Sequence, residues 1–176
     1  MRIFTALPLP QSTKDLLVSI TRGRLPISYI NTINLHITLN FFGEVSSDRL
    51  GGLTQTFSKF CQGQKSFLVE FSRLQMFYHQ IHLTVSKNDP IMKFQKELEK
   101  NFKNLGFNFQ DRSFYPHVKL ASVHMDNNMF PKRKIENYPH EELSKLNFLA
   151  DRVVLYESQL LESHAKHIPI KEESLL

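Results

Sequence analysis

The most constraining feature of this sequence is a run of alternating apolar and polar side chains over residues 34–45, NLHITLNFFGEV. In this run Ile37 and Leu39 alternate with His36 and Thr38. Successive side chains of a strand project to opposite faces, so a period of two predicts a strand with one covered face. The imidazole and the hydroxyl then lie side by side on the other face.

The same period of two, or a short apolar run bounded by turn residues, predicts further strands. Between them, apolar residues recur every three to four positions, which is typical of helices with one buried face. The polar residues 125–140 predict an irregular loop, and residues 171–176 predict a frayed tail. The expected strands are residues 2–9, 34–45, 67–74, 80–86, 112–123, 147–160 and 165–170, and the expected helices are capped by Ser12 or Thr13, Ser46 or Ser47, and Asp89.

These alternating strands indicate the fold class. They favour antiparallel sheets with one covered face, whereas a doubly wound parallel sheet is typically built from continuous apolar runs. The sequence therefore predicts an α+β fold. With 176 residues, of which 41% are hydrophobic and 22% charged, the chain is of a size and composition that suit a single domain, residues 1–176.

Charge, cysteine content and hydropathy exclude several classes of protein. The formal net charge of +5 is compatible with a polyanionic partner such as RNA. The one cysteine, Cys61, excludes an internal disulfide framework, and its apolar periodic neighbourhood predicts a buried thiol rather than a nucleophile. Because no run of about 18 apolar residues and no secretory signal is present, we expect a soluble, cytoplasmic protein without a membrane partner.

A second triplet, HVK at residues 117–119, has the same form as HIT at residues 36–38. Residues i and i+2 share a strand face, so each triplet places an imidazole beside a group that can hold a phosphate oxygen. Imidazole has an ordinary pKa of about 6.5, so a neutral and a protonated histidine can act together as general base and general acid. The pair predicts phosphodiester chemistry without a metal or other cofactor, with Thr38 and Lys119 as phosphate ligands.

Either triplet alone is typical of an ordinary strand histidine, but the longer segments carry more information. NLHITLNFFGEV and RSFYPHVKLA resemble the two signature segments of the 2H phosphoesterase superfamily, especially its bacterial RNA 2′,3′-cyclic phosphodiesterase (LigT-like) branch. RIFTALPLP resembles the first strand of that branch, FGEV its exit from the first motif, and VVLYESQL followed by HIPI its closing hairpin. The resemblance thus covers most of the chain in order.

This resemblance implies a bilobal fold in which two antiparallel β-sheets face a central cleft, with helices outside. It implies that His36 is the proton donor to the leaving 3′ oxygen of ribose and that His117 is the proton acceptor that activates water. The implied substrate is RNA with a 2′,3′-cyclic phosphate end, and the implied product is a 2′-phosphomonoester. Neither a metal nor a nucleotide cofactor is implied, and we expect a monomer.

The chain departs from the family pattern at Lys119, where the second motif usually has threonine or serine, and near Ser122, where a basic residue often follows. Lys119 can replace both lost groups, or it can indicate a changed substrate or weakened turnover. Among the aromatic residues, Phe42, Tyr115 and Tyr156 are candidates for stacking on an RNA base, with core packing as the alternative for each.

Other functions stay open at this point. The chain can be a catalytically weakened nucleotide- or RNA-binding module of the 2H fold, or a 2H enzyme that acts on another cyclic phosphate or in RNA 2′-5′ ligation. It can also be a basic RNA-binding protein with incidental histidines. Two pairs of histidines are spaced by three, His79 with His82 and His164 with His167, and we predict a metal site at neither. No nearby Asp, Glu or Cys completes a ligand set for His79 and His82.

Overall fold

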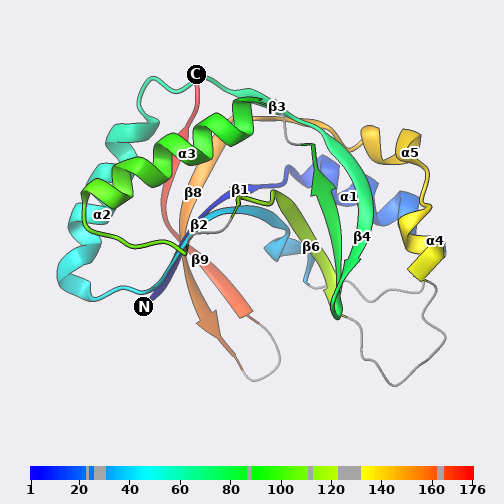
Figure 1. The fold of residues 1–176 in the computed structure, drawn as a ribbon, viewed down its shortest axis with the longest axis horizontal. Helices are drawn as coiled ribbons and strands as arrows, with labels where there is room; N and C mark the ends of the chain where they lie inside the picture. Colours follow the sequence, from blue (N-terminus) through cyan, green and yellow to red (C-terminus); the bar gives the residue numbers. More distant parts are fainter. Residues whose placement is uncertain (23, 26–30, 87–88, 111–112, 123–131, 162–164) are drawn as a thin grey trace.

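In a computed structural model of the protein, the segments with a period of two form strands and those with a helical period form helices (Figure 1). The structure describes residues 1–22, 24–25, 31–86, 89–110, 113–122, 132–161 and 165–176. The strands are β1 (Arg2–Pro8), β2 (His36–Glu44), β3 (Phe67–Val69), β4 (Phe71–Phe77), β5 (Gln80–Val85), β6 (His117–Ser122), β7 (Phe148–Ala150), β8 (Arg152–Leu160) and β9 (Ala165–Ser174). The helices are α1 (Gln11–Thr21), α2 (Ser47–Cys61), α3 (Asp89–Asn104), α4 (Lys132–Glu136) and α5 (His140–Ser144).

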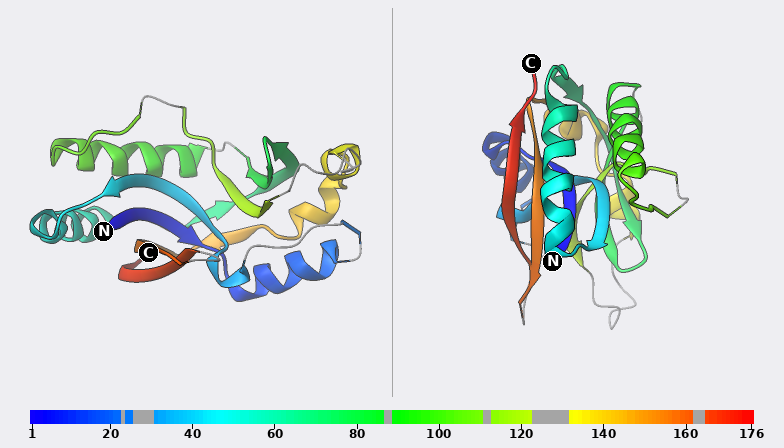
Figure 2. Two further views of the ribbon diagram at one scale, coloured as in Figure 1. Left: turned by 90° about the horizontal axis from the view of Figure 1, so that it is seen from below. Right: turned by 90° about the vertical axis from the view of Figure 1, so that its left-hand side faces the viewer.

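Within the described residues, the strands form a seven-stranded sheet in the order β4-β5-β6-β2-β1-β8-β9 and a two-stranded sheet of β3 and β7. Every pairing between these strands is antiparallel. The large sheet consists of two units, β4-β5-β6 and β2-β1-β8-β9, which meet where Ile37 of β2 pairs with Val118 of β6. The predicted α+β fold with two antiparallel units is confirmed, and the structure adds that the two units share one curved sheet (Figure 2).

The helices divide between the two units. Figure 1 shows α2 and α3 beside the unit that contains β1, β2, β8 and β9, and α1, α4 and α5 around the unit that contains β4, β5 and β6. Contacts of α3 with β2, of α2 with β8 and β9, and of α4 and α5 with β4 agree with this division. Each unit therefore has its own helical cover, and the pairing of β2 with β6 joins the two units.

The apolar side chains of the strands at the junction belong to the hydrophobic core. Ile37 and Val118, which pair across the junction, are fully buried, and so is Leu83, which pairs with Val118 from β5. Because side chains alternate along a strand, the neighbours His36 and His117 project from the opposite face. Burial of the apolar face holds the sheet against the core, and the opposite face carries the two histidines.

Two predictions of secondary structure, a single strand and an irregular loop, are wrong. Residues 67–74 do not form one strand, because the chain leaves β3 after Val69 and enters β4 at Phe71, whose backbone N–H donates to the Asn147 side chain (2.8 Å). Residues 132–136 form α4 rather than a loop, and Ile135 is fully buried there. A single buried apolar residue in a charged segment has no periodicity to reveal a helix. Residues 125–131 of the predicted loop lie outside the described residues.

The predicted tail and one predicted cap are also wrong. β9 continues to Ser174, which pairs with Arg152 of β8, so backbone pairing orders residues that are too charged to predict a strand. Charged side chains on such an edge strand discourage pairing with another chain. Pro10 occupies the cap of α1 in place of Ser12 or Thr13, and its carbonyl accepts from the backbone N–H of Lys14 (3.0 Å).

Two other expectations can be compared with the structure. Cys61 is 1% exposed at the end of α2, and burial raises the pKa of its thiol to about 12, so the predicted core cysteine is confirmed. Among the described helices, none has the length and apolar character needed to cross a membrane.

We predict that Phe102→Ala lowers the free energy of unfolding by about 3–5 kcal/mol, because it removes a fully buried ring of α3 and leaves a cavity. Urea unfolding followed by circular dichroism measures the change. The control is Leu105→Ala, at a side chain that is 38% exposed just beyond the same helix, which should cost about 0.5 kcal/mol or less. Equal losses for the two variants would contradict this description of the core.

Candidate active site

His36 is the first residue of β2, and its ring is held by two hydrogen bonds. Nδ1 lies 2.6 Å from the backbone carbonyl of Asn34, and Nε2 lies 3.0 Å from Oγ1 of Thr38. A carbonyl can only accept, so Nδ1 carries the hydrogen. In the neutral ring Nε2 therefore has a free lone pair, and the Thr38 hydroxyl donates to it.

His117, the first residue of β6, is held in the same way. Its Nδ1 lies 2.8 Å from the backbone carbonyl of Tyr115, again the residue two positions earlier. This hydrogen bond again fixes the hydrogen on Nδ1 and leaves the Nε2 lone pair available in the neutral ring. The two histidines thus have matching local geometry, and in each case Nε2 is the atom that can exchange a proton with a ligand.

The junction of the two sheet units brings these histidines together. Ile37 pairs with Val118, so an antiparallel register sets Thr38 opposite His117 and Lys119 opposite His36 on the same face. Diagonal neighbours in such a pair are about 7–8 Å apart, which leaves room for one tetrahedral group between two side chains. The structure therefore brings together the four polar residues that the sequence singled out.

Further rings flank each histidine. The His36 ring lies 5.0 Å from the Phe4 ring and 5.2 Å from the His167 ring, centroid to centroid. The His117 ring stacks on His82 at 4.0 Å, and the Nε2 of His82 lies 2.9 Å from Oε1 of Gln80. Sequence reasoning missed Phe4, His82 and His167. Alternation along β5 is compatible with a position of His82 on the face of the site. Only the pairing of β5 with β6 shows that His82 lies beside His117.

The candidate stacking residues have different surroundings. Tyr156 lies 6.4 Å from His36 and stacks on Phe4 at 5.2 Å, and Tyr115 lies 5.1 Å from His117 while its hydroxyl donates to Oε1 of Gln75 (3.2 Å). Phe42 instead packs among core rings, which favours core packing over stacking on a base for this side chain. The rings around Phe42 are Phe102, Phe107 and Phe109.

Burial controls the charge of the histidines. It lowers the pKa of His36 to about 4, against a rise caused by the Asn34 carbonyl and with further lowering by nearby His167, His117 and Lys14. Burial also lowers the pKa of His117, against a rise caused by the Tyr115 carbonyl. Both rings are therefore neutral near pH 7 in the free protein. An anion placed between them would favour the imidazolium form and raise both pKa values.

His82 strengthens this tendency. It is 3% exposed, and burial lowers its pKa to about 4, with further lowering by His117 and Lys119. Because His82 stacks directly on His117, a proton on either ring would disfavour a proton on the other. Among the described residues, no group of three or more His, Cys, Asp or Glu side chains is arranged to hold a metal ion, and His164 lies outside those residues.

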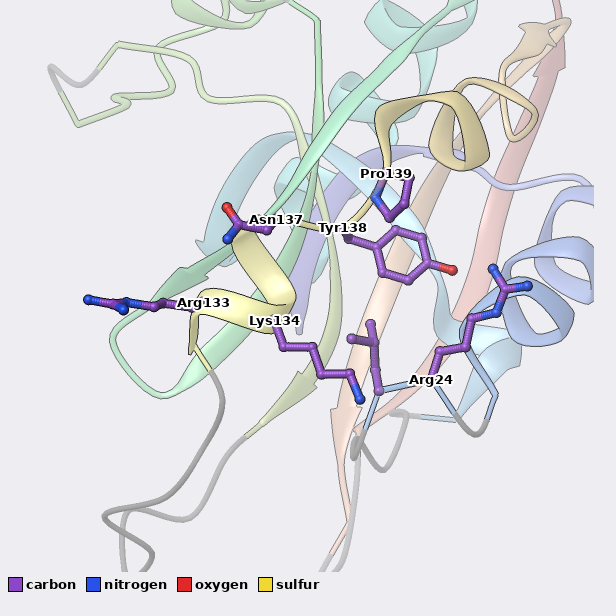
Figure 3. A pocket seen from close by; sticks show the side chains of 7 residues that line it. Arg24, Arg133, Lys134, Asn137, Tyr138 and Pro139 are labelled. Carbon is purple, nitrogen blue, oxygen red and sulfur yellow. The ribbon is translucent and has the colours of Figure 1, made fainter.

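A cavity of about 360 Å³ lies beside His36, and Tyr156 and His167 also line it. Another cavity, of about 590 Å³, lies near the end of α1 and α4, with Arg24, Lys134 and Tyr138 in its wall (Figure 3). Neither His36 nor His117 lines this larger cavity. The site with the chemistry is the one at the strand junction.

Comparisons with known proteins show which proteins this chain is similar to. The sequence model of the 2′-5′ RNA ligase superfamily matches residues 19–160. A protein of Methanocaldococcus jannaschii named RNA 2′,3′-cyclic phosphodiesterase is 25% identical over 98% of this chain and 99% of its own length. A protein of the same name from Thermotoga maritima is 22% identical over 91% of this chain and 88% of its own. The structure of E. coli LigT complexed with 3′-AMP aligns with a TM-score of 0.77 and 19% identity, covering 99% of this chain and 97% of that one.

We predict that the imidazole of His36 in the free protein titrates near pH 4, well below the ordinary value of about 6.5. NMR titration of the imidazole carbon-bound protons measures it. Adding inorganic phosphate should raise the pKa of both His36 and His117. A His36 pKa of 6.5 or above without an anion would contradict the described burial.

Proposed function

Because the chain belongs to the 2′-5′ RNA ligase superfamily, we propose that it hydrolyses the 2′,3′-cyclic phosphate ends of RNA to 2′-phosphomonoesters. The observation that carries the proposal is the pair His36 and His117 on neighbouring strands, each with Nδ1 bound to a carbonyl and Nε2 free to exchange a proton. The names of the relatives from M. jannaschii and T. maritima support the same substrate class.

In the proposed reaction, the cyclic phosphate lies between the two rings. Neutral His117 takes a proton from water at Nε2 while the water oxygen bonds to phosphorus. The bond from phosphorus to the 3′ oxygen breaks, and protonated His36 gives its Nε2 proton to that oxygen. A free 3′ hydroxyl and a 2′-phosphate result, and exchange of one proton with solvent restores each histidine.

The lowered pKa of His36 is compatible with the acid role. A buried imidazolium is a stronger acid than a solvated one, so its proton transfer to the leaving oxygen is favourable once it is formed. The negative charge of the bound phosphate offsets the burial that disfavours that form. When Nε2 of His36 carries a proton, it no longer accepts from Thr38, and the hydroxyl is released to donate to a phosphate oxygen.

Lys119 supplies the remaining positive charge in this proposal. It pairs with His82 across β5 and β6, and the register at the junction sets it opposite His36. An ammonium at this position can stabilise the charge that develops on the non-bridging oxygens. Its presence where the family usually has a hydroxyl also favours the second candidate function, a 2H-fold module that binds such ends but turns them over weakly.

The proposal extends to the organisation of the protein. Each histidine comes from a different unit of the sheet, so neither unit contains a complete site. We therefore propose that residues 1–176 act as one domain. We also propose that the protein is a monomer and acts in the cytoplasm. The two-histidine mechanism requires no metal ion, so we also propose that the reaction proceeds in its absence.

We predict that the purified protein opens an oligoribonucleotide with a 2′,3′-cyclic phosphate end in the presence of EDTA, giving a 2′-phosphate detectable by mass spectrometry. His36→Ala and His117→Ala should each lower kcat by about 10²- to 10⁴-fold, since a general acid or base contributes that much. His79→Ala, which removes an exposed histidine in the turn after β4, is the matched control and should retain full activity. Activity lost with EDTA and restored by a metal would overturn the mechanism.

We predict that Lys119→Thr lowers kcat/KM by about 10- to 100-fold, the effect of losing a hydrogen bond from a charged donor worth about 1.5–3 kcal/mol. Steady-state kinetics on the same oligoribonucleotide measure the change. Increased turnover in this variant would show that Lys119 hinders the reaction, and the weakened binding module would then describe the wild-type protein better.

A further inference from the structure

Three cationic side chains from three separate elements line the cavity beside His36. They are Lys14 of α1, Arg152 of β8 and Lys166 of β9, in a cavity of about 360 Å³. Among the described residues that line the cavity, Glu172 is the one carboxylate, and its Oε1 lies 3.5 Å from Nη1 of Arg152. The cavity wall therefore has an excess of positive charge, which favours an anionic occupant.

Lys14 is the strongest sign that the occupant is an anion. Its side chain is only 9% exposed, and Nζ donates to the backbone carbonyl of Ile33 at a long 3.4 Å. Within the described part of the chain it forms no ion pair. Burial lowers its pKa, and Arg152 lowers it further, against a rise caused by Asp15. A buried ammonium is costly unless it is paired, and a bound anion would supply the missing partner.

The cavity adjoins the proposed reaction centre on the side of His36. His36 lines both the cavity and the face shared with His117, whereas His117 does not line the cavity. If His36 protonates the leaving 3′ oxygen, the ribose that owns this oxygen lies on the His36 side of the phosphorus. The rest of that nucleotide, including the phosphate on its 5′ oxygen, is then directed towards the cationic cavity.

We propose that the cavity lined by Lys14, Arg152 and Lys166 binds the 5′-phosphate group of the nucleotide whose ribose carries the cyclic phosphate. The inference rests on the proposed function and deepens it. The site selects ends that continue into a phosphodiester backbone over free nucleoside 2′,3′-cyclic phosphates, which lack this group. Its volume falls within the range of small-ligand pockets, about 300–1,000 Å³.

The test compares two substrates that differ only by the group in question, adenosine 2′,3′-cyclic phosphate and its 5′-phosphorylated form. We expect the wild-type protein to have a kcat/KM about 10- to 100-fold higher for the 5′-phosphorylated form, as for hydrogen bonds to a charged group. The ratio of the two values isolates the cavity from any general effect on turnover. A ratio of one in the wild-type protein would overturn the inference.

Lys166→Gln is the main variant, because this side chain is exposed and its removal leaves the core intact. We expect it to reduce the ratio about tenfold. Lys14→Met, which keeps the length of the buried chain and removes its charge, should reduce the ratio further, with circular dichroism to verify folding. Lys96→Gln, on the exposed face of α3, removes the same charge elsewhere and should leave the ratio unchanged. An unchanged ratio in Lys166→Gln and Lys14→Met would overturn the inference.

A binding measurement separates this inference from the proposed function. If the wild-type protein hydrolyses neither these nucleotides nor the oligoribonucleotide with a 2′,3′-cyclic phosphate end, the proposed function fails. Calorimetry with adenosine 2′-monophosphate and adenosine 2′,5′-bisphosphate then tests the cavity alone. Tighter binding of the bisphosphate, lost in Lys166→Gln and kept in Lys96→Gln, supports the cavity as a phosphate site. Equal Kd values for the two nucleotides would overturn it.

Discussion

The pairing of Ile37 with Val118 is the constraint on which the arrangement of the site depends. It is the backbone register that joins two antiparallel units into one sheet, and it determines which residues of β2 and β6 are neighbours. A slip by one residue would turn every side chain of one strand to the other face. Both paired residues are fully buried, so apolar burial opposes that slip and holds His36 and His117 on a common face.

The same burial sets the protonation states of the polar face. Rings of Phe4 and Tyr156 on one side and of His82 and Tyr115 on the other remove water from the two histidines, which therefore favour their neutral forms. Carbonyl oxygens hold each Nδ1 hydrogen, so neutrality leaves both Nε2 atoms as bases. One of the proposed pair has to become an acid, and the charge of a bound phosphate provides the energy for that change. Substrate binding and activation of the acid are thus coupled.

Much of this could be predicted from the sequence, because its signals were local. Alternation over NLHITLNFFGEV placed His36 and Thr38 on one face, and the helical spacing after the predicted cap Asp89 located α3. The flanking groups could not be predicted. The positions of His82 and His167 depend on strand pairings between distant segments, and so does that of Phe4, which the pairing of β1 with β2 sets on the face of His36. The helix α4 depends on burial of Ile135, and the end of β9 on pairing with β8.

Lys14 is unfavourable for the free protein, since burial leaves its charge poorly solvated. The same charge disfavours protonation of His36. A core without function would be more stable with an apolar side chain at this position. The arrangement becomes favourable when one phosphate lies between the histidines and a second lies in the cavity. The two anions would neutralise the positive charges that burial makes costly. Positive charge is in excess around His36, on a sheet face that is partly dehydrated. This excess accounts both for the instability of the empty site and for the proposed preference for a substrate with two neighbouring phosphates.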